Sequence, residues 1–211
     1  SIYQFLKRYF SRKKTYKLGA LKDKEDPRDF LYKIRRYESL PASTYRRNIE
    51  AVAFRYDQGN IGSCVGHGMV EAFRATLKRN GQPDFEASRL FAYYIAREDK
   101  LNDTGASIRD AFKAMNKHGL CSEKIIPYCT KKFAEKPSDK AWEEALFHQS
   151  IRYERLPQNK DAIRDALSKG YPIVYGKLLY ESFMSEDTAK TGFVRCLSVF
   201  RSLVKILLTR P

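Results

Sequence analysis

A glutamine and a cysteine separated by a glycine-containing loop form the part of this sequence best suited to chemistry. Gln58 stands six residues before Cys64, and Gly62 and Ser63 directly precede the cysteine. Apolar residues recur at a roughly helical period from there to residue 79, which predicts that the cysteine begins a helix. The positive end of a helix dipole lowers the pKa of a thiol placed there and favours the nucleophilic thiolate. The Gln58 amide and the Cys64 N–H would then form an oxyanion hole for acyl transfer.

The elements that must position these residues are mainly helices in the first part of the sequence and strands in the second. Apolar periodicity predicts helices near 63–80, 87–98, 107–118, 138–147 and 161–168. Ser107 and Ser138 are candidate N-caps, and Gly119 and Gly170 are candidate helix ends. Alternating or β-branched residues predict strands over 151–156 and 171–180. Helices first and strands later indicate an α+β protein with segregated lobes.

The sequence resembles the papain-like cysteine peptidases, whose nucleophile motif reads Q-G-x-x-G-S-C at the start of a long helix. It is similar in particular to the bacterial and phage branch, whose segments are matched in order at 40–43, 55–59, 91–97, 107–112 and 171–176. The resemblance runs from about residue 26 to 193. It implies a papain-like two-lobe fold within 21–211, with a helical lobe over about 57–130. Residues 21–56 would be an extended lead-in to the cysteine loop. A β-barrel-like lobe would cover about 150–211, together with part of this lead-in.

The same resemblance implies hydrolysis of peptide bonds by a cysteine endopeptidase. Cys64 would be the nucleophile, and Gln58 would belong to the oxyanion hole. Thr104 and Gly105 match the place where the family's glycine-rich strand hydrogen-bonds extended substrate backbone, although a simple turn before a helix is the alternative interpretation. No cofactor and no metal site are expected, since no Cys-x-x-Cys or His-x-x-x-His pair occurs.

The histidine that such an enzyme needs as its base is not visible. In papain-like enzymes it lies roughly 130–150 residues after the cysteine, and this sequence has no histidine after His148. His67, three residues after Cys64, is the one base candidate, and its alternative role is that of a core residue of the helix. His118 is expected to interact with the C-terminal dipole of its helix. His148 comes too early to be the family's base.

The family pattern is lost after Phe193, which suggests that the sequence is truncated or changes reading frame before the catalytic histidine. The second lobe would then be an incomplete sheet with an open edge, and the apolar residues at 203–208 would either cover that edge or lack a partner. Two functions therefore stay open. The first is a peptidase that needs His67, a base from another chain or a longer sequence. The second is a catalytically silent papain-fold module that binds a peptide or an acidic partner.

Composition restricts the class of protein. The chain has 211 residues, a net charge of +15 and 43% hydrophobic residues, without an apolar run of the roughly 18–20 residues that a membrane span needs. No signal peptide is visible. The four cysteines do not form a disulfide pattern, and Cys121, Cys129 and Cys196 are expected to be free thiols. A soluble protein, cytoplasmic or virion-associated rather than secreted, is the expectation.

The N-terminal residues 1–20 are predicted to form a basic amphipathic arm. Residues 1–50 contain 14 lysines and arginines against 6 acidic residues, so they carry +8 of the net charge. Apolar side chains recur in the arm at helical spacing, at Ile2, Phe5, Leu6, Tyr9 and Phe10. Such a segment can bind an acidic protein or an anionic lipid surface, or pack on its own domain. Nucleic acid is a further partner that no sequence motif supports.

Overall fold

The computed structural model describes residues 17–34, 56–149, 152–176 and 203–208. Most of the predicted arm, the lead-in from residue 35 to 55 and the segment that holds Phe193 and Cys196 lie outside these ranges. The first described elements are β1 (Ala20–Leu21), α3 (Cys64–Arg79), α4 (Arg89–Ala96), β2 (Ala106–Ser107), α5 (Ile108–His118), η1 (Thr130–Lys132), α6 (Asp139–Ala145) and η2 (Leu146–His148). After them come β3 (Arg152–Leu156), α7 (Lys160–Ser168), β4 (Ile173–Gly176) and β5 (Leu203–Leu208). None of the helices in the described ranges is long and apolar enough to cross a membrane.

Strands β3, β5 and β4 form an antiparallel sheet with β5 in the centre. Ile206 of β5 lies opposite Glu154 on one side and Ile173 on the other. The apolar segment 203–208 therefore pairs along both of its edges and is a central strand, not a cover for an open edge. The strand predicted at 151–156 is confirmed. The one predicted at 171–180 is observed over 173–176, and its continuation lies outside the described residues.

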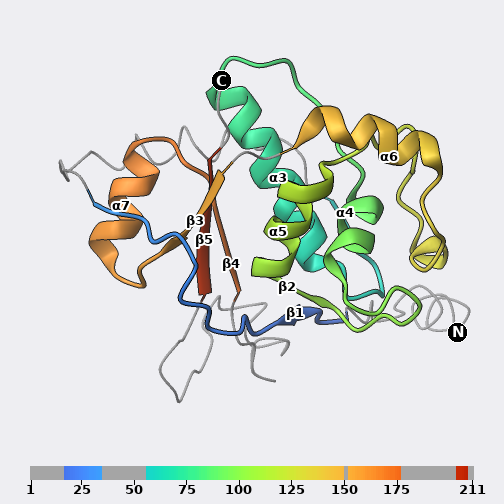
Figure 1. Cartoon of the computed structure of the whole chain (residues 1–211), viewed down its shortest axis with the longest axis horizontal. Coiled ribbons are helices and arrows are strands. Elements are labelled where there is room, and N and C mark those ends of the chain that lie inside the picture. The colour runs from blue at the N-terminus through green and yellow to red at the C-terminus, as the bar shows by residue number, and fades with distance from the viewer. Residues whose placement is uncertain (1–16, 35–55, 150–151, 177–202, 209–211) are drawn as a thin grey trace, which may run out of the picture.

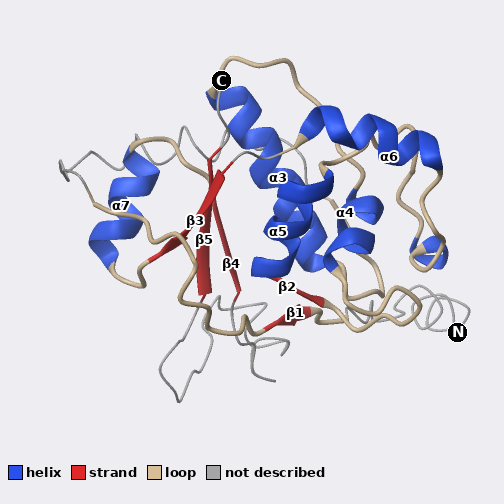
Figure 2. Ribbon diagram, in the orientation of Figure 1, coloured by secondary structure: helices blue, strands red, loops and turns tan. Residues whose placement is uncertain are grey.

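The sheet separates α7 from the other helices, as Figure 1 shows, with α3 and α5 on the side opposite α7. The colouring by element type in Figure 2 shows the same division, because the helices α3 to α6 gather on one side of the three red strands. Strands β1 and β2 form a separate parallel pair below the helices. This is the α+β arrangement that the order of the predicted elements indicates.

Local capping explains where the helices begin and end. The hydroxyls of Ser107 and Ser138 accept hydrogen bonds from backbone N–H groups of the first turns of α5 and α6, which confirms both predicted N-caps. Gly119 follows α5 at a φ of 75° and donates its N–H to the Met115 carbonyl. His118 is the last residue of α5, but burial, with the nearby lysines, lowers its pKa, which disfavours the cationic form that a dipole interaction would need.

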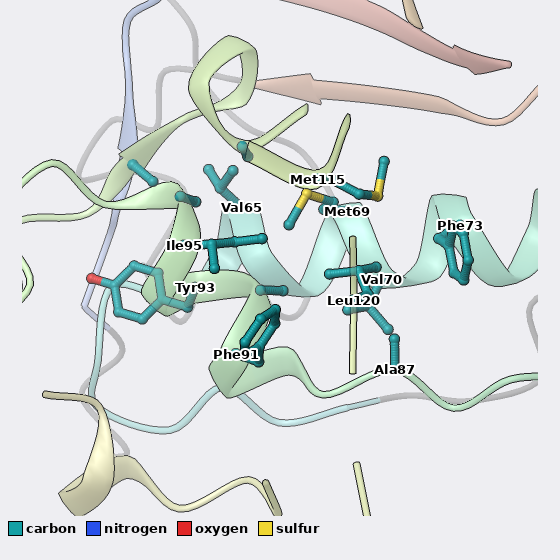
Figure 3. Close-up of a cluster of buried hydrophobic side chains, with 14 of the residues drawn as sticks. Val65, Met69, Val70, Phe73, Ala87, Phe91, Tyr93, Ile95, Met115 and Leu120 are labelled. Atoms are coloured by element: carbon teal, nitrogen blue, oxygen red, sulfur yellow. The ribbon is translucent and has the colours of Figure 1, made fainter. Parts of the chain in front are cut away.

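The main core lies between α3, α4 and α5. Met69, Val70, Phe91, Phe112 and Met115 are fully buried there, and Figure 3 shows side chains of α3 facing those of α4 and the segment around Leu120. Each such side chain contributes about 1.5–3 kcal/mol by leaving water. A smaller cluster packs α7 on the sheet, and its buried members are Tyr32, Leu156, Ala162 and Ala166. The helix that begins at Cys64 is thus held by the larger core.

A charged cluster joins the lead-in to helix α5. The Arg109 guanidinium binds the carboxylates of Asp26 and Asp29, with 2.6 Å between Nε and Asp29 Oδ1. Its backbone N–H donates to Asp23 Oδ1 at 2.9 Å. These side chains are mostly buried. They therefore anchor residues 17–34 across the end of α5, next to the β1–β2 pair.

Candidate active site

Cys64 is the first residue of α3 and is half-buried. Ser63 is the N-cap but makes no side-chain cap hydrogen bond to the helix, and α3 has no acidic residue in its first turn. The thiol is free, and it lies at the end of the helix where backbone N–H groups are unpaired. The predicted start of this helix, and with it the predicted place of the cysteine, is confirmed.

The loop before Cys64 is held by hydrogen bonds that the sequence alone did not reveal. Gly59 has a φ of 63° and donates its N–H to Asp57 Oδ1 at 2.9 Å. Tyr128 donates its hydroxyl to the Gln58 carbonyl at 2.8 Å and lies 2.6 Å from Ser63 Oγ. One tyrosine from a distant loop therefore connects both ends of the Gln58–Cys64 segment.

The Gln58 carboxamide binds backbone carbonyl groups. Its Nε2 donates to the Ile61 carbonyl at 3.1 Å and to the Lys17 carbonyl at 2.9 Å. The first bond orients the side chain within its own loop. The second is made to an extended peptide segment more than forty positions earlier in the chain. The side chain predicted to stabilise an oxyanion thus already contacts a peptide carbonyl oxygen.

Residues 17–21 pack between the Gln58–Cys64 loop and β2, and we call the space that these residues occupy the cleft. The Gly19 carbonyl accepts a hydrogen bond from the Ala106 N–H at 2.8 Å, and Ala20 and Leu21 pair in parallel with β2. A Cβ on Gly19 would lie 1.9 Å from the Gly62 oxygen, and one on Gly105 would lie 2.3 Å from the Gly19 oxygen. The three backbones approach so closely that only glycine fits at these positions.

Thr104 and Gly105, the predicted substrate-binding residues, line this cleft, but their own N–H groups are used elsewhere. Gly105 N–H donates to the Tyr93 hydroxyl at 3.1 Å, and Thr104 N–H donates to the Asn102 carbonyl at 3.0 Å. The donor to the extended segment is the next residue, Ala106. The sequence did not single out Ala106, since no residue type marks which backbone N–H binds a neighbouring segment.

The sequence also did not single out Asp103, a carboxylate that contacts the Gln58–Cys64 loop, Tyr93 and Lys17. It accepts the Gly62 N–H at 3.0 Å and the Tyr93 hydroxyl, and it forms an ion pair of 2.8 Å with Lys17 Nζ. Burial raises its pKa, but the hydrogen bonds from Lys17, Tyr93 and Gly62 outweigh burial, so the pKa is lowered. The carboxylate is therefore ionised and close to the Gln58–Cys64 loop.

His67, the candidate base, is hydrogen-bonded away from the thiol. Its Nδ1 lies 3.0 Å from the Ser63 carbonyl, and its ring packs edge-on against Tyr56 and Tyr128. Its buried Nε2 has no partner among the described residues. Burial lowers its pKa. No hydrogen bond joins His67 to the Cys64 sulfur in the described part of the chain, and the imidazole packs against two tyrosine rings.

Among the described residues, His118, His148 and Cys121 lie elsewhere in the helical region. His148 stacks on Phe85, with the ring centroids 3.7 Å apart, and His118 contacts the edge of Trp142. Cys121 is buried, and burial raises the pKa of its thiol to about 12. Within the described ranges no three His, Cys, Asp or Glu side chains are grouped closely enough to hold a metal ion.

Comparison with known proteins identifies the family of the chain. The sequence model of the papain family cysteine proteases matches residues 40–192, which span most of the chain and include the Gln58–Cys64 loop. The chain belongs to the papain family of cysteine proteases. This papain-family chain is 36% identical over 196 residues to an uncharacterized peptidase C1-like protein, L477, of Acanthamoeba polyphaga mimivirus. That match covers 86% of the chain and 60% of the viral protein.

Solved structures of the papain family give the fold. The crystal structure of xylellain, a cysteine protease from Xylella fastidiosa, superposes with a TM-score of 0.70 at 30% identity, covering 83% of this chain and 71% of that one. Digestive procathepsin L 3 of the Tenebrio molitor larval midgut gives 0.57 at 18% identity, covering 74% and 50%. The papain-like α+β fold implied by the sequence resemblance is therefore confirmed. The chain spans 60% of the length of the curated viral relative that it matches.

Proposed function

We propose that this chain is a cysteine peptidase acting on peptide or protein substrates, with Cys64 as the nucleophile. Gln58 and the Cys64 N–H would hold the oxyanion. Membership of the papain family and the position of Cys64 at the start of α3 support this proposal. Because the chain spans 60% of its curated viral relative, the activity of the whole protein is part of the same proposal.

The observation that carries the proposal is the hydrogen bond from the Gln58 amide to the Lys17 carbonyl. A substrate carbonyl at the same place would lie within reach of the side chain that must stabilise its negative charge in the transition state. The neighbouring Ala106 N–H binds the Gly19 carbonyl of the same extended segment. A substrate peptide that replaced residues 17–21 could accept hydrogen bonds from the same two donors.

The reaction would proceed through a thioester. The Cys64 thiolate attacks the substrate carbonyl carbon, the C–S bond forms and the oxygen takes the negative charge. The C–N bond then breaks as the leaving amine receives a proton, and water hydrolyses the thioester to release the acid and the thiol. For the proton transfers we propose either a rotation of His67 toward the sulfur or a base from another chain, because no described histidine is bonded to Cys64.

A second candidate function is a silent binding module of the same fold. The absence of a hydrogen bond between Cys64 and any of the described histidines favours it, as does a cleft that holds an extended segment through backbone contacts. In this case the cleft would bind peptide without cleaving it. The basic arm over 1–20 would bind an acidic protein or an anionic surface as a further partner. Residues 1–16 of the arm lie outside the described residues.

Labelling with a thiol-directed peptidyl epoxide separates the two functions. The thiolate opens the epoxide ring, so labelling reports on the nucleophile without needing a complete catalytic cycle. A peptidase should be modified selectively at Cys64, with a rate that depends on pH, and mass spectrometry of tryptic peptides locates the adduct. Cys129, a free thiol that is also half-buried, is the internal reference. Equal labelling of both thiols, or labelling no faster than free cysteine, would favour the silent module.

Kinetics of Gln58→Ala then test the oxyanion role. Removing one oxyanion donor typically lowers the turnover rate by about 100- to 1,000-fold. We therefore expect the variant to retain the Cys64 thiol and its labelling while losing most of any peptide hydrolysis measured with the unmodified chain. Cys64→Ala, which should remove both, is the matched control. Unchanged turnover in Gln58→Ala would contradict the assigned role.

We also propose a soluble protein of the cytoplasm or of a virion. The free thiols of Cys121 and Cys129 support a reducing environment, and the similarity to a mimivirus protein supports a viral setting. Immunodetection in fractionated host cells and purified particles tests the location. Recovery from the secreted fraction alone would contradict it.

A further inference from the structure

The cleft beside Cys64 contains a carboxylate whose contacts define a binding position for a cation. Asp103 Oδ1 accepts hydrogen bonds from the Gly62 N–H and the Tyr93 hydroxyl, and Gly62 is two residues before the nucleophile. Oδ2 shares the Gly62 N–H at 3.1 Å and otherwise faces Lys17 Nζ. Only 12% of this side chain is exposed. Apart from the hydrogen bonds from Gly62 and Tyr93, the carboxylate of Asp103 contacts one positively charged group, the Lys17 ammonium.

Lys17 occupies that place in a particular way. Its Nζ lies 2.8 Å from Asp103 Oδ2 and 2.6 Å from the Asp103 carbonyl, while its own backbone carbonyl accepts the hydrogen bond from Gln58. One residue therefore places its carbonyl at the oxyanion donor and its side chain on Asp103. In a substrate, the residue whose carbonyl reaches Gln58 is the one immediately before the bond to be cleaved.

A neutral side chain at this place would leave the carboxylate poorly satisfied. Without Lys17, Oδ2 keeps only its share of the Gly62 N–H, and a mostly buried carboxylate without a partner is costly. An ammonium or guanidinium group restores a charge-assisted hydrogen bond, which is stronger than a neutral one. The chemistry of the cleft thus discriminates among substrates by charge, not by apolar volume.

We propose that Asp103 is the specificity-determining residue of this site, and that the site selects peptides with lysine or arginine immediately before the cleaved bond. The inference rests on the proposed function, because it names the substrate class of the same cleft. Lys17 is then an internal occupant of the position that a basic substrate side chain would take. Substrate must displace it to bind.

A pair of reactive ketones tests this preference. Two acyloxymethyl ketones that differ only in lysine or norleucine beside the reactive carbon are compared on the full chain. The Cys64 thiolate forms a C–S bond to the methylene carbon as the carboxylate leaves, and intact mass spectrometry follows the adduct. We expect the lysine compound to react about tenfold faster, as a charge-assisted hydrogen bond worth about 1.4 kcal/mol implies. Equal rates would overturn the proposal.

Two substitutions that each remove one negative charge test whether the preference for the lysine ketone depends on Asp103. Asp103→Asn can keep the hydrogen bonds from Gly62 and Tyr93 through its amide oxygen, but it loses the negative charge. The lysine-to-norleucine rate ratio should fall to about one. Asp99→Asn, in an exposed turn of the same loop, is the matched control and should keep the ratio of the unmodified chain. A preference that survives in Asp103→Asn, or disappears in Asp99→Asn, refutes the role of Asp103.

Lys17→Ala provides a variant that leaves the Asp103 carboxylate in place. Removing the competing ammonium should raise the rate with the lysine ketone more than the rate with the norleucine ketone, because only the former uses the vacated position. An equal effect on both would contradict the assignment of Lys17 as occupant. This comparison tests the proposal even where Asp103→Asn fails to fold.

A binding measurement separates this proposal from the proposed function. If neither ketone labels Cys64, the nucleophile assignment fails. The affinity of the cleft for peptides then shows whether the cation position at Asp103 exists. Fluorescent tripeptides ending in lysine or norleucine are titrated into Lys17→Ala and followed by anisotropy. Preferential binding of the lysine peptide, lost when Asp103→Asn is added, supports the cation position in a non-catalytic module. Indifference to the side chain overturns it.

Discussion

Replacing Tyr128 with phenylalanine removes one hydroxyl from the support of the active-site loop. That hydroxyl donates to the Gln58 carbonyl at 2.8 Å and lies 2.6 Å from Ser63 Oγ. The ring itself keeps its edge-on contact with His67. The substitution therefore leaves the packing volume almost unchanged and tests hydrogen bonding alone.

The structure allows an estimate of the loss. Each of the two hydrogen bonds contributes about 1 kcal/mol, and the Gln58 carbonyl is left without this donor, so the free energy of unfolding should fall by about 2 kcal/mol. Burial raises the pKa of Tyr128, so the hydroxyl stays protonated and able to donate at neutral pH. For a chain of this size, such a loss lowers Tm by about 4–8 °C.

The measurement is urea unfolding followed by circular dichroism, with epoxide labelling of Cys64 as a second readout. Tyr175→Phe is the control, because Tyr175 is 63% exposed on β4, and a surface change of this kind stays within about 0.5 kcal/mol. Tyr128→Phe should also slow labelling, since the loop that orients Gln58 and Cys64 is less constrained. A Tyr128→Phe variant as stable and as reactive as the Tyr175→Phe control would refute the view that Tyr128 supports the loop.

Three further outcomes follow from the same contacts. Gly119→Ala should destabilise the chain by more than about 3 kcal/mol in urea unfolding, because its φ is 75° and the new Cβ would lie 1.7 Å from the Ala145 oxygen. Burial lowers the pKa of folded His67 below the ordinary histidine value of 6.5. The unfolded chain therefore takes up the proton first, stability falls as pH drops through 6.5, and His67→Asn should flatten that slope. The lowered pKa of Asp103 has the opposite sign. Its ion pair with Lys17 should persist above the ordinary aspartate pKa of 3.8 and be lost as pH falls through the folded pKa, which carboxyl-carbon NMR can follow.

The positions of the Gln58–Cys64 loop and of the helices were predictable because the signals that set them are local in the sequence. The serines before α5 and α6, the glycine after α5 and the apolar period of α3 each act within a few residues. A helix that begins at Cys64 follows from those signals alone. The limits of α4 were less accurate, since it ends at Ala96 and not near residue 98.

The supports of the site were not predictable, because they come from residues far apart in the sequence. Tyr128 is seventy positions from Gln58, and Lys17 is forty-one from it. No spacing rule connects such pairs. The central position of β5 is of the same kind, because an apolar segment does not reveal which strands it pairs with.

The sequence by itself determined the loop from Gln58 to Cys64 and the helix that begins at the cysteine, since neighbouring residues dictate a turn and a helical period. Only the tertiary structure decided what surrounds them. It packs His67 against aromatic rings, directs the Ala106 N–H to the Gly19 carbonyl and pairs the Lys17 ammonium with the Asp103 carboxylate. These outcomes depend on which distant segments pack together. That packing is governed by the burial of whole helix faces, not by the identity of any one residue.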